Sequence, residues 1–314
     1  MNICGRGVCK IALAFGWLLL VGSRMCSAQE LQMRYLGVAG WEIRSGHTVV
    51  LIDPYLTRLE FDSEQIEQDA KKYFASYYPS PDTAAIDRQI TRADFILVHH
   101  AHADHILDVP YIAKKTGAKV IGTESSMNIL RAHGVAENQL YTVQGGEDYQ
   151  FEGFSLRVIR SLHSPLHAKT YFDSRRYTHA PAVPLNYSDF IEGGSLMFLC
   201  RFAGTQIMTM GSMNFIEGEL QGMKPDILLA GAGATRTEIY QYAERLLRAT
   251  GYPSIVMPAH WDNADYTDQQ AQAQAIKERV EPFRKEVAAA SPRSKFVVPK
   301  HMKTMIVTGG AVEQ

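Results

Sequence analysis

Short apolar runs and stretches of alternating apolar and polar residues recur along the chain from Leu31 onward, and they predict a succession of β-strands. The first three form a meander, with Ser45-Gly46 as a tight turn between the second and the third. The expected strands are, in chain order, Gln32–Val38, Trp41–Arg44, Thr48–Asp53, Phe95–Val98, Ala118–Gly122, Ser155–Ile159, Ser195–Phe202, Gln206–Met210, Pro225–Ala230, Ser254–Pro258 and Phe296–Val298.

Helices are expected between these strands. The stretch Ser125–Ala132 can be capped by Thr123 or Ser125 and end at Gly134. Glu238–Ala249 has apolar residues spaced for one helix face, and Thr267–Ala288 is a polar helical stretch in which Pro282 predicts a kink or a break. Strands that alternate with helices predict an α/β fold, and 46% apolar residues suffice for one domain with a large core.

The first 28 residues have the features of a segment that is removed. Arg6 and Lys10 precede the apolar run Ile11–Gly22, and Cys26-Ser27-Ala28 ends in small residues suited to signal peptidase. The run is shorter than the roughly twenty residues that cross a membrane, and a retained amino-terminal anchor is the alternative. We therefore expect a signal peptide over residues 1–28, a secreted or periplasmic protein without stable membrane insertion, and one domain over residues 29–314.

Cysteine usage and charge agree with such a mature domain. Of the four cysteines only Cys200 follows the leader, so no internal disulfide is expected, and the domain suits an oxidising compartment without one. Removal of Arg6, Lys10 and Arg24 with the leader takes the net charge from −1 to −4. This acidic balance gives no basis for nucleic-acid binding, and we expect a small-molecule substrate as the partner. Nothing in the sequence indicates an oligomeric state.

Two polar stretches rich in aromatic residues interrupt the strand pattern. Residues 60–92 predict a surface excursion with a short helix, and a lid over the site is the alternative. Residues 168–189 contain Tyr171, Arg175, Arg176 and Tyr177 and predict a substrate-facing loop.

The candidate chemistry gathers in the stretch His99–His105, directly after the apolar strand that ends at Val98. Residues two apart on an extended segment point the same way, so His100 and His102 can present two imidazoles to one ion. The chain then turns, and Asp104 and His105 can face a second ion nearby. A polar loop that is rich in histidine by chance is the alternative, but imidazole and carboxylate together suit zinc, iron or manganese.

The pattern His-x-His-x-Asp-His after an apolar strand resembles the signature of the metallo-β-lactamase fold hydrolases. The resemblance extends from about Leu31 to the last residues. The stretches Tyr35–Trp41 and Val49–Leu56 resemble the branch of ascorbate-6-phosphate lactonase-like and N-acyl-phosphatidylethanolamine phospholipase D-like enzymes. The resemblance implies a four-layer αββα sandwich, the metallo-β-lactamase form of the α/β class.

The resemblance also implies the remaining ligands. His163 follows a strand and corresponds to the third imidazole of the first metal, whereas His260 corresponds to the carboxyl-terminal ligand of the second. The expected metal ligands are thus His100, His102, Asp104, His105, His163 and His260. Asp53 is interpreted either as a cap of local backbone amides or as a carboxylate that orients a ligand histidine. His167 and His179 are weaker candidates for contact with substrate or metal.

One residue departs from the pattern. The strand Gln206–Met210 leads into Gly211-Ser212, where the resemblance implies a Gly-Asp pair whose carboxylate bridges two metals. A serine hydroxyl is a neutral and weak ligand, so the second metal is expected to bind more weakly, to be absent, or to be held partly by a neighbour such as Asn214.

The function implied by the resemblance is metal-dependent hydrolysis, in which a metal-activated water attacks an ester, lactone or phosphoester bond. We expect one or two Zn2+ ions, with Mn2+ or Fe2+ as alternatives, and Asp104 as the catalytic residue that orients the water or carries its proton. The alternative is a non-catalytic secreted protein that binds a metal or another ligand on the same fold, which Ser212 motivates. Redox chemistry at a di-iron centre is a further alternative.

Overall fold

A computed structural model of the chain describes residues 1, 30–165, 169, 173, 175–202, 204–262, 266–308 and 311–313. The expected signal peptide lies outside the described residues apart from Met1, as do His167 and part of the expected loop 168–189. None of the helices in the described part of the chain is both long enough and apolar enough to cross a membrane.

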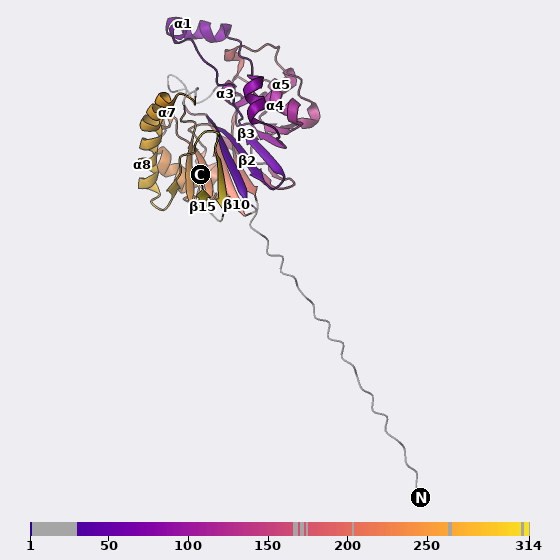
Figure 1. Cartoon of the computed structure of the whole chain (residues 1–314), viewed down its shortest axis with the longest axis vertical. Coiled ribbons are helices and arrows are strands. Elements are labelled where there is room, and N and C mark those ends of the chain that lie inside the picture. Colours follow the sequence, from indigo (N-terminus) through magenta and orange to yellow (C-terminus); the bar gives the residue numbers. More distant parts are fainter. Residues whose placement is uncertain are drawn as a thin grey trace.

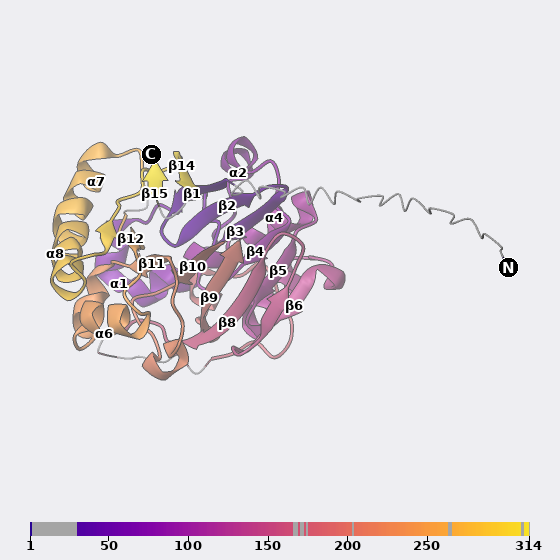
Figure 2. The same cartoon turned by 90° about the horizontal axis from the view of Figure 1, so that it is seen from below.

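Two β-sheets pack face to face (Figure 2). In the described residues the first sheet has eight strands in the spatial order β15-β14-β1-β2-β3-β4-β5-β6. Their bounds in chain order are β1 Leu31–Gly37, β2 Gly40–Ser45, β3 Thr48–Ile52, β4 Phe95–Leu97, β5 Lys119–Gly122, β6 Leu140–Thr142, β14 Thr304–Thr308 and β15 Ala311–Glu313. The meander β1-β2-β3 is antiparallel, as predicted, and β3 to β6 are parallel.

The second sheet has seven strands in the described residues, in the order β13-β12-β11-β10-β9-β8-β7. Their bounds are β7 Asp148–Gln150, β8 Ser155–Ser161, β9 Ser195–Phe202, β10 Thr205–Met210, β11 Ile227–Gly231, β12 Ile255–Ala259 and β13 Lys295–Phe296. Strands β9 and β10 form the expected hairpin, with Thr205 opposite Phe202.

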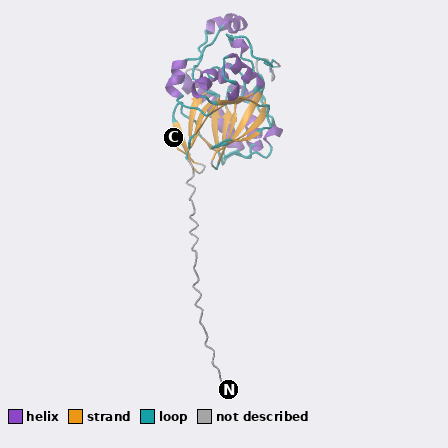
Figure 3. Ribbon diagram, turned by 90° about the vertical axis from the view of Figure 1, so that its right-hand side faces the viewer, coloured by secondary structure: helices purple, strands orange, loops and turns teal. Residues whose placement is uncertain are grey.

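Helices cover the outer face of each sheet (Figures 1 and 3). The first sheet is covered by α2 (Thr83–Gln89), α3 (Ala103–Ile106), α4 (Val109–Thr116) and α5 (Glu124–Ala132), and the second by α6 (Tyr242–Ala249), α7 (Gln269–Ala275) and α8 (Glu281–Ala290). Helix α1 (Ser63–Ser76) stands apart from these layers at one end of the molecule in Figure 1. The expected α/β fold and four-layer αββα sandwich are confirmed.

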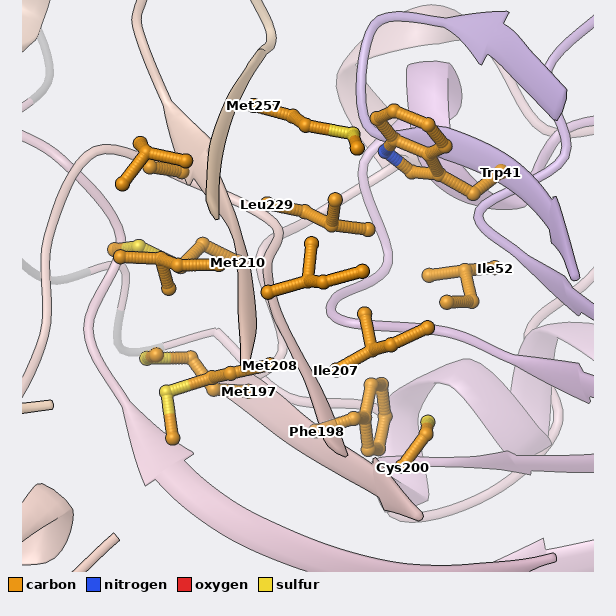
Figure 4. Packing of buried hydrophobic residues seen from close by; sticks show 14 of the residues in the cluster. Trp41, Ile52, Met197, Phe198, Cys200, Ile207, Met208, Met210, Leu229 and Met257 are labelled. Carbon is orange, nitrogen blue, oxygen red and sulfur yellow. The ribbon is translucent and has the colours of Figure 1, made fainter. Parts of the chain in front are cut away.

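Alternation along each strand explains the layers. In β3, Val50 and Ile52 face the second sheet, whereas Val49 and Leu51 face the helices, and all four are buried. Figure 4 shows Trp41 and Ile52 of the first sheet opposite residues of the second, among them Ile207 and Phe198. Cys200 is buried in the interior of β9, as expected for a cysteine that acts as a small apolar residue.

Three details differ from the prediction. The helix expected over Glu238–Ala249 begins at Tyr242, because Glu238 belongs to a preceding 3-10 turn, Ala234–Glu238, and Gln241 has a left-handed φ of +44°. The stretch around Pro282 does not break: α7, a π-helical turn at Ile276–Val280 and α8 follow one another directly, and the irregularity expected at Pro282 takes the form of the π-helical turn before it. The insertion 60–92 holds two helices instead of one short helix.

Candidate metal centre

All segments that carry candidate ligands leave the two sheets at the same end of the sandwich. Asp53 follows β3, the stretch His99–His105 follows β4, His163 follows β8, and His260 follows β12. Parallel strands place their carboxyl ends at one edge of a sheet, so residues distant in sequence are brought together there.

The first group consists of His100, His102 and His163. Their potential ligand nitrogens all lie within 4.8 Å of one another. The ring centroids are 4.7 to 4.9 Å apart, and each pair of rings is nearly perpendicular. His100 Nε2 lies 3.0 Å from His102 Nδ1. Three imidazoles thus present nitrogens to one point from three directions.

These three imidazoles are held in the neutral form that binds metal. Burial lowers the pKa of His102 to about 3 and that of His163 to about 4, and neighbouring histidines add to the shift for His102. Burial also lowers the pKa of His100 well below its ordinary value. The Nδ1–H of His163 donates to the carbonyl oxygen of Ser164 at 2.9 Å, which leaves the Nε2 lone pair for a ligand.

The second group consists of Asp104, His105 and His260, and its potential ligand atoms also lie within 4.8 Å of one another. Asp104 Oδ2 is 3.4 Å from His260 Nε2 and 3.6 Å from His105 Nε2. Burial alone would raise the pKa of Asp104, but His105 and His260 outweigh it and hold this pKa far below its ordinary value. His105 Nε2 is buried and has no hydrogen-bond partner among the described residues.

Asp53 connects this group to the interior. Its Oδ2 accepts hydrogen bonds from Nδ1 of His105 and from Nδ1 of His99, each at 2.5 Å. Burial opposes ionisation, but the two imidazoles outweigh it and lower the pKa of Asp53 to about 2. The contact with His105 agrees with the interpretation of Asp53 as a carboxylate that orients a ligand histidine, because it directs Nε2 of His105 toward Asp104 and His260.

His99 was not distinguished from its neighbours in the sequence. It is buried, it donates from Nδ1 to Asp53, and its Nε2 accepts from the hydroxyl of Thr209 at 2.7 Å. Because Thr209 belongs to β10 of the second sheet, His99 links the two sheets behind the ligand groups.

Ser212 and Asn214 hold the segment that carries His163. The hydroxyl oxygen of Ser212 accepts a hydrogen bond from the backbone N–H of Ser164 at 2.9 Å. Asn214 donates from Nδ2 to the carbonyl oxygen of His163 at 3.0 Å, and its Oδ1 accepts from the N–H of Phe215. Both ends of the Asn214 amide are therefore used by the backbone, which leaves its oxygen poorly placed to replace a bridging carboxylate.

A second buried carboxylate, Asp262, was also missed in the sequence. It accepts from the backbone N–H of Val38 at 2.8 Å, from the Tyr35 hydroxyl at 2.8 Å and from His301 Nε2 at 2.9 Å. Arg58 lies 3.5 Å from it. The neighbouring His260 has a φ of +56° and donates its N–H to the carbonyl of Val38, so Asp262 fixes the turn that presents His260.

Both ligand groups face one cleft with a volume of about 500 Å3. Its lining includes residues of both groups, His102, Asp104, His163 and His260, together with Ser212 and the aromatic residues Phe74, Tyr187 and Phe190. His179 is exposed and belongs to none of the potential metal-binding groups in the described residues. The volume is in the range of clefts that bind small molecules.

The chain is similar to a described family of domains. The model of the beta-lactamase superfamily domain matches residues 32–260. Among curated relatives, a UPF0173 metal-dependent hydrolase of Polynucleobacter asymbioticus is 27% identical over 263 residues, which are 80% of this chain and 84% of that one. A UPF0173 metal-dependent hydrolase of Myxococcus xanthus is 28% identical, and the match spans 48% of this chain and 46% of that protein.

Two solved structures share the fold. Igni18, a metallo hydrolase from Ignicoccus hospitalis, has a TM-score of 0.55 at 18% identity, with 89% of this chain and 99% of that chain covered. CmlA, a diiron β-hydroxylase from Streptomyces venezuelae, has a TM-score of 0.54 at 15% identity, with 89% of this chain and 54% of that chain covered.

Proposed function

The chain belongs to the beta-lactamase superfamily, in its metallo-β-lactamase fold, and we propose that it is a secreted metal-dependent hydrolase of a small ester, lactone or phosphoester. Metal-dependent hydrolase is the activity by which the curated relatives are named. Secretion, the metal and the bond that is broken are parts of the proposal that rest on the residues of this chain.

One observation carries the proposal: two groups of potential ligands, joined by the adjacent residues Asp104 and His105, face the same cleft. We infer that His100, His102 and His163 hold one ion and that Asp104, His105 and His260 hold the other. The donor set fits this use, because the three residues of the first group are neutral imidazoles and the buried Nε2 of His105 has no hydrogen-bond partner among the described residues. Nitrogen and carboxylate donors favour Zn2+, with Mn2+ or Fe2+ as alternatives.

When bound, such a cation polarises the bond to be broken and lowers the pKa of water towards roughly 7. The protein contributes orientation and a proton acceptor. Asp53 fixes the ring of His105, and Asp262 fixes the turn that carries His260. Asp104 is ionised at neutral pH and is part-exposed to the cleft, so its carboxylate can orient a water molecule or take its proton.

The proposed bond class rests on the branch that the sequence resembles. The stretches Tyr35–Trp41 and Val49–Leu56 resemble the lactonase-like and phospholipase D-like branch, which favours carboxylic and phosphoric esters. Cys200 lies in the interior of β9 and is absent from both ligand groups, which argues against the cysteine-using lactamases. The acidic charge expected of the mature chain argues against a nucleic-acid substrate.

Secretion is supported by the sequence of the first 28 residues, with Arg6 and Lys10 before an apolar run and Ala28 at the expected cleavage site. Expression of the full chain followed by amino-terminal sequencing of the exported protein tests it. A mature protein that begins near Gln29 supports secretion, and an unprocessed amino terminus contradicts it.

The activity is tested with a panel of chromogenic esters, lactones and phosphodiesters. We expect turnover that a chelator removes and that zinc or manganese restores. His102→Ala should lose turnover and retain less metal, whereas His179→Ala, at an exposed residue outside both ligand groups, should keep both. Metal binding without turnover on any member of the panel would support the non-catalytic alternative instead.

A further inference from the structure

Aromatic side chains form a cluster beside the candidate metal centre. Its members come from the insertion and from the short 3-10 turn Tyr187–Asp189. The ring of Phe74 in α1 lies 4.9 Å from that of Tyr187, and Phe61 lies 5.6 Å from Phe74 and 5.1 Å from Tyr187. Tyr77 also packs against Phe61, with ring centroids 5.7 Å apart. We call Phe61, Phe74, Tyr77 and Tyr187 the aromatic wall.

The aromatic wall faces the same cleft as the candidate ligands. Phe74 and Tyr187 line this cleft together with His102, Asp104 and His260, and the buried Phe190 extends the apolar lining. An apolar group of a substrate that reaches the ligand groups therefore lies within the cavity that these rings border. The other two members of the wall, Phe61 and Tyr77, pack against Phe74 and Tyr187 without lining the cleft.

The chain on both sides of α1 is hydrogen-bonded to the segment that follows the ligand His105. Asp108, which is buried and follows His105 by three residues, accepts hydrogen bonds from the N–H groups of Leu56 at 2.5 Å and Thr57 at 2.9 Å. It also accepts from the Thr57 hydroxyl, whose oxygen accepts in turn from the N–H of Asp82 at 2.8 Å. Both ends of the excursion that carries α1 are thus tied to the same point.

The chain just before α1 also contacts the segment that carries the ligand His260. Arg58 pairs with Asp262, which follows His260 by two residues, and it donates to the carbonyl of Leu36. At the far end of α1, the carbonyl of Tyr77 accepts from the N–H of Tyr187 at 2.8 Å. A passive surface loop needs no such connections, so these contacts indicate that the position of the rings relative to the ligand groups is built into the fold.

The guanidinium that lines the cleft near these rings already has partners. Of the described residues that line it, Arg175 carries a guanidinium, but this group pairs with Asp173 at 2.8 Å and donates to the carbonyl of Ser188. Aromatic side chains provide large apolar faces that bind flat rings by stacking or edge contacts. The wall therefore matches an apolar group next to the bond that is broken.

On the basis of the proposed function, we propose that Phe74 and Tyr187 determine specificity by binding an aromatic acyl or alcohol group of the substrate, so that the natural substrate class is aromatic esters or lactones. The cleft volume of about 500 Å3 accommodates one or two rings beside the reacting bond. The insertion 60–92, expected to be a surface excursion, is then a wall of the active site.

The test compares two esters of one acid on the metal-loaded enzyme, 1-naphthyl acetate and ethyl acetate. Phe74→Ala should lower kcat/KM for 1-naphthyl acetate about 10-fold while it leaves kcat/KM for ethyl acetate unchanged. The free energy of one contact between aromatic rings corresponds to about that factor in rate. Tyr78→Ala is the matched control, because Tyr78 follows Tyr77 in the sequence, is 56% exposed and does not line the cleft. An equal effect on both esters, or none on either, overturns the proposal.

Binding of 1-naphthol, followed by its fluorescence, gives a result that does not depend on turnover. Affinity should fall about 10-fold in Phe74→Ala and stay unchanged in Tyr78→Ala. If the wild type hydrolyses neither ester and no member of the panel of esters, lactones and phosphodiesters, the proposed function fails. The comparison of 1-naphthol affinities still tests the role of Phe74, and equal affinities in wild type and Phe74→Ala overturn that role. Should Phe74→Ala not fold, Phe74→Leu retains an apolar side chain without a ring, and unchanged selectivity between the esters in that variant overturns the proposal as well.

Discussion

Asp53 holds His105 through a hydrogen bond of 2.5 Å between Oδ2 and Nδ1, which turns Nε2 of His105 toward Asp104 and His260. Both residues are fully buried, and the same Oδ2 serves His99. A single interior carboxylate thereby sets the tautomer and the orientation of an imidazole in the second ligand group.

Replacement of this carboxylate should weaken the second metal position. Asp53→Ala leaves two buried imidazole N–H groups without an acceptor, so we expect a loss of about 3 kcal/mol in the free energy of unfolding and of about 10- to 100-fold in metal affinity. Chemical denaturation and zinc titration measure the two effects. The exposed Asp87→Asn is the control, and unchanged zinc affinity in Asp53→Ala contradicts the assigned role.

Ser212→Asp should strengthen the second metal position. A carboxylate there adds a negative charge in the cleft, and we expect about 10-fold tighter binding of the second ion. Ser212→Ala removes only the acceptor for the N–H of Ser164, so it should cost about 1 kcal/mol of stability without tighter metal binding. Zinc titration of both variants checks this, and equal affinities in Ser212→Asp and Ser212→Ala would contradict it.

Gly37 should tolerate no side chain. It has a φ of +92°, and a Cβ there would lie 1.6 Å from Arg58 Nη2 and 2.6 Å from Asp262 Oδ2. Gly117 has a φ of +75° and nothing within 4 Å of an added Cβ. Gly117→Ala should therefore cost about 1 kcal/mol for the backbone alone, and Gly37→Ala several kcal/mol more, because it displaces the buried pair. Thermal or chemical unfolding compares them, and similar losses would show that the Arg58–Asp262 contact is unimportant.

Asp108 should give stability a pH dependence of unusual sign. Burial raises its pKa from 3.8 to about 6 in the folded protein. A raised carboxyl pKa means that the folded state favours the protonated form, so this contribution is full below about pH 4 and is lost as the pH rises through about 6. The loss is about 3 kcal/mol.

Asp108→Asn, which stays neutral, isolates this contribution. The difference in unfolding free energy between wild type and variant should shift in favour of the variant between pH 4 and 7 by about that amount. Measurement of both proteins at each pH cancels the titration of all other groups. A difference that is constant with pH would mean that the three donors to Asp108 from Leu56 and Thr57 offset its burial.

The sequence predicted the elements that local pattern determines. Apolar runs located the strands that lead to Asp53, His100 and His260. The spacing of His100 and His102 predicted that both face one ion, whereas the convergence of His163 and His260 with them was implied by the family resemblance. The short strands β6, β7, β14 and β15 were missed, since they have few residues and are defined by their pairing, β14 with β1 and β15 with β14. The Arg58–Asp262 pair and the role of Asp108 were missed because each contact joins residues more than 50 positions apart without a pattern of their own.

The position of the insertion 60–92 relative to the cleft could not be predicted either, because it also depends on contacts between distant residues. Its aromatic residues are evident in the sequence. Whether Phe74 faces solvent or the cleft depends on the contacts made by the chain before α1 and on Tyr187, which lies over 100 residues later. No local pattern distinguishes a surface excursion from a wall of the site.

Metal content per chain tests the central claim most directly. Protein purified without chelator, reloaded with zinc and dialysed should retain about two ions per chain, whereas His102→Ala should retain fewer and lose turnover. Retention of no zinc by the wild type, or equal zinc in wild type and His102→Ala, would contradict the assignment of His100, His102 and His163 as a metal site.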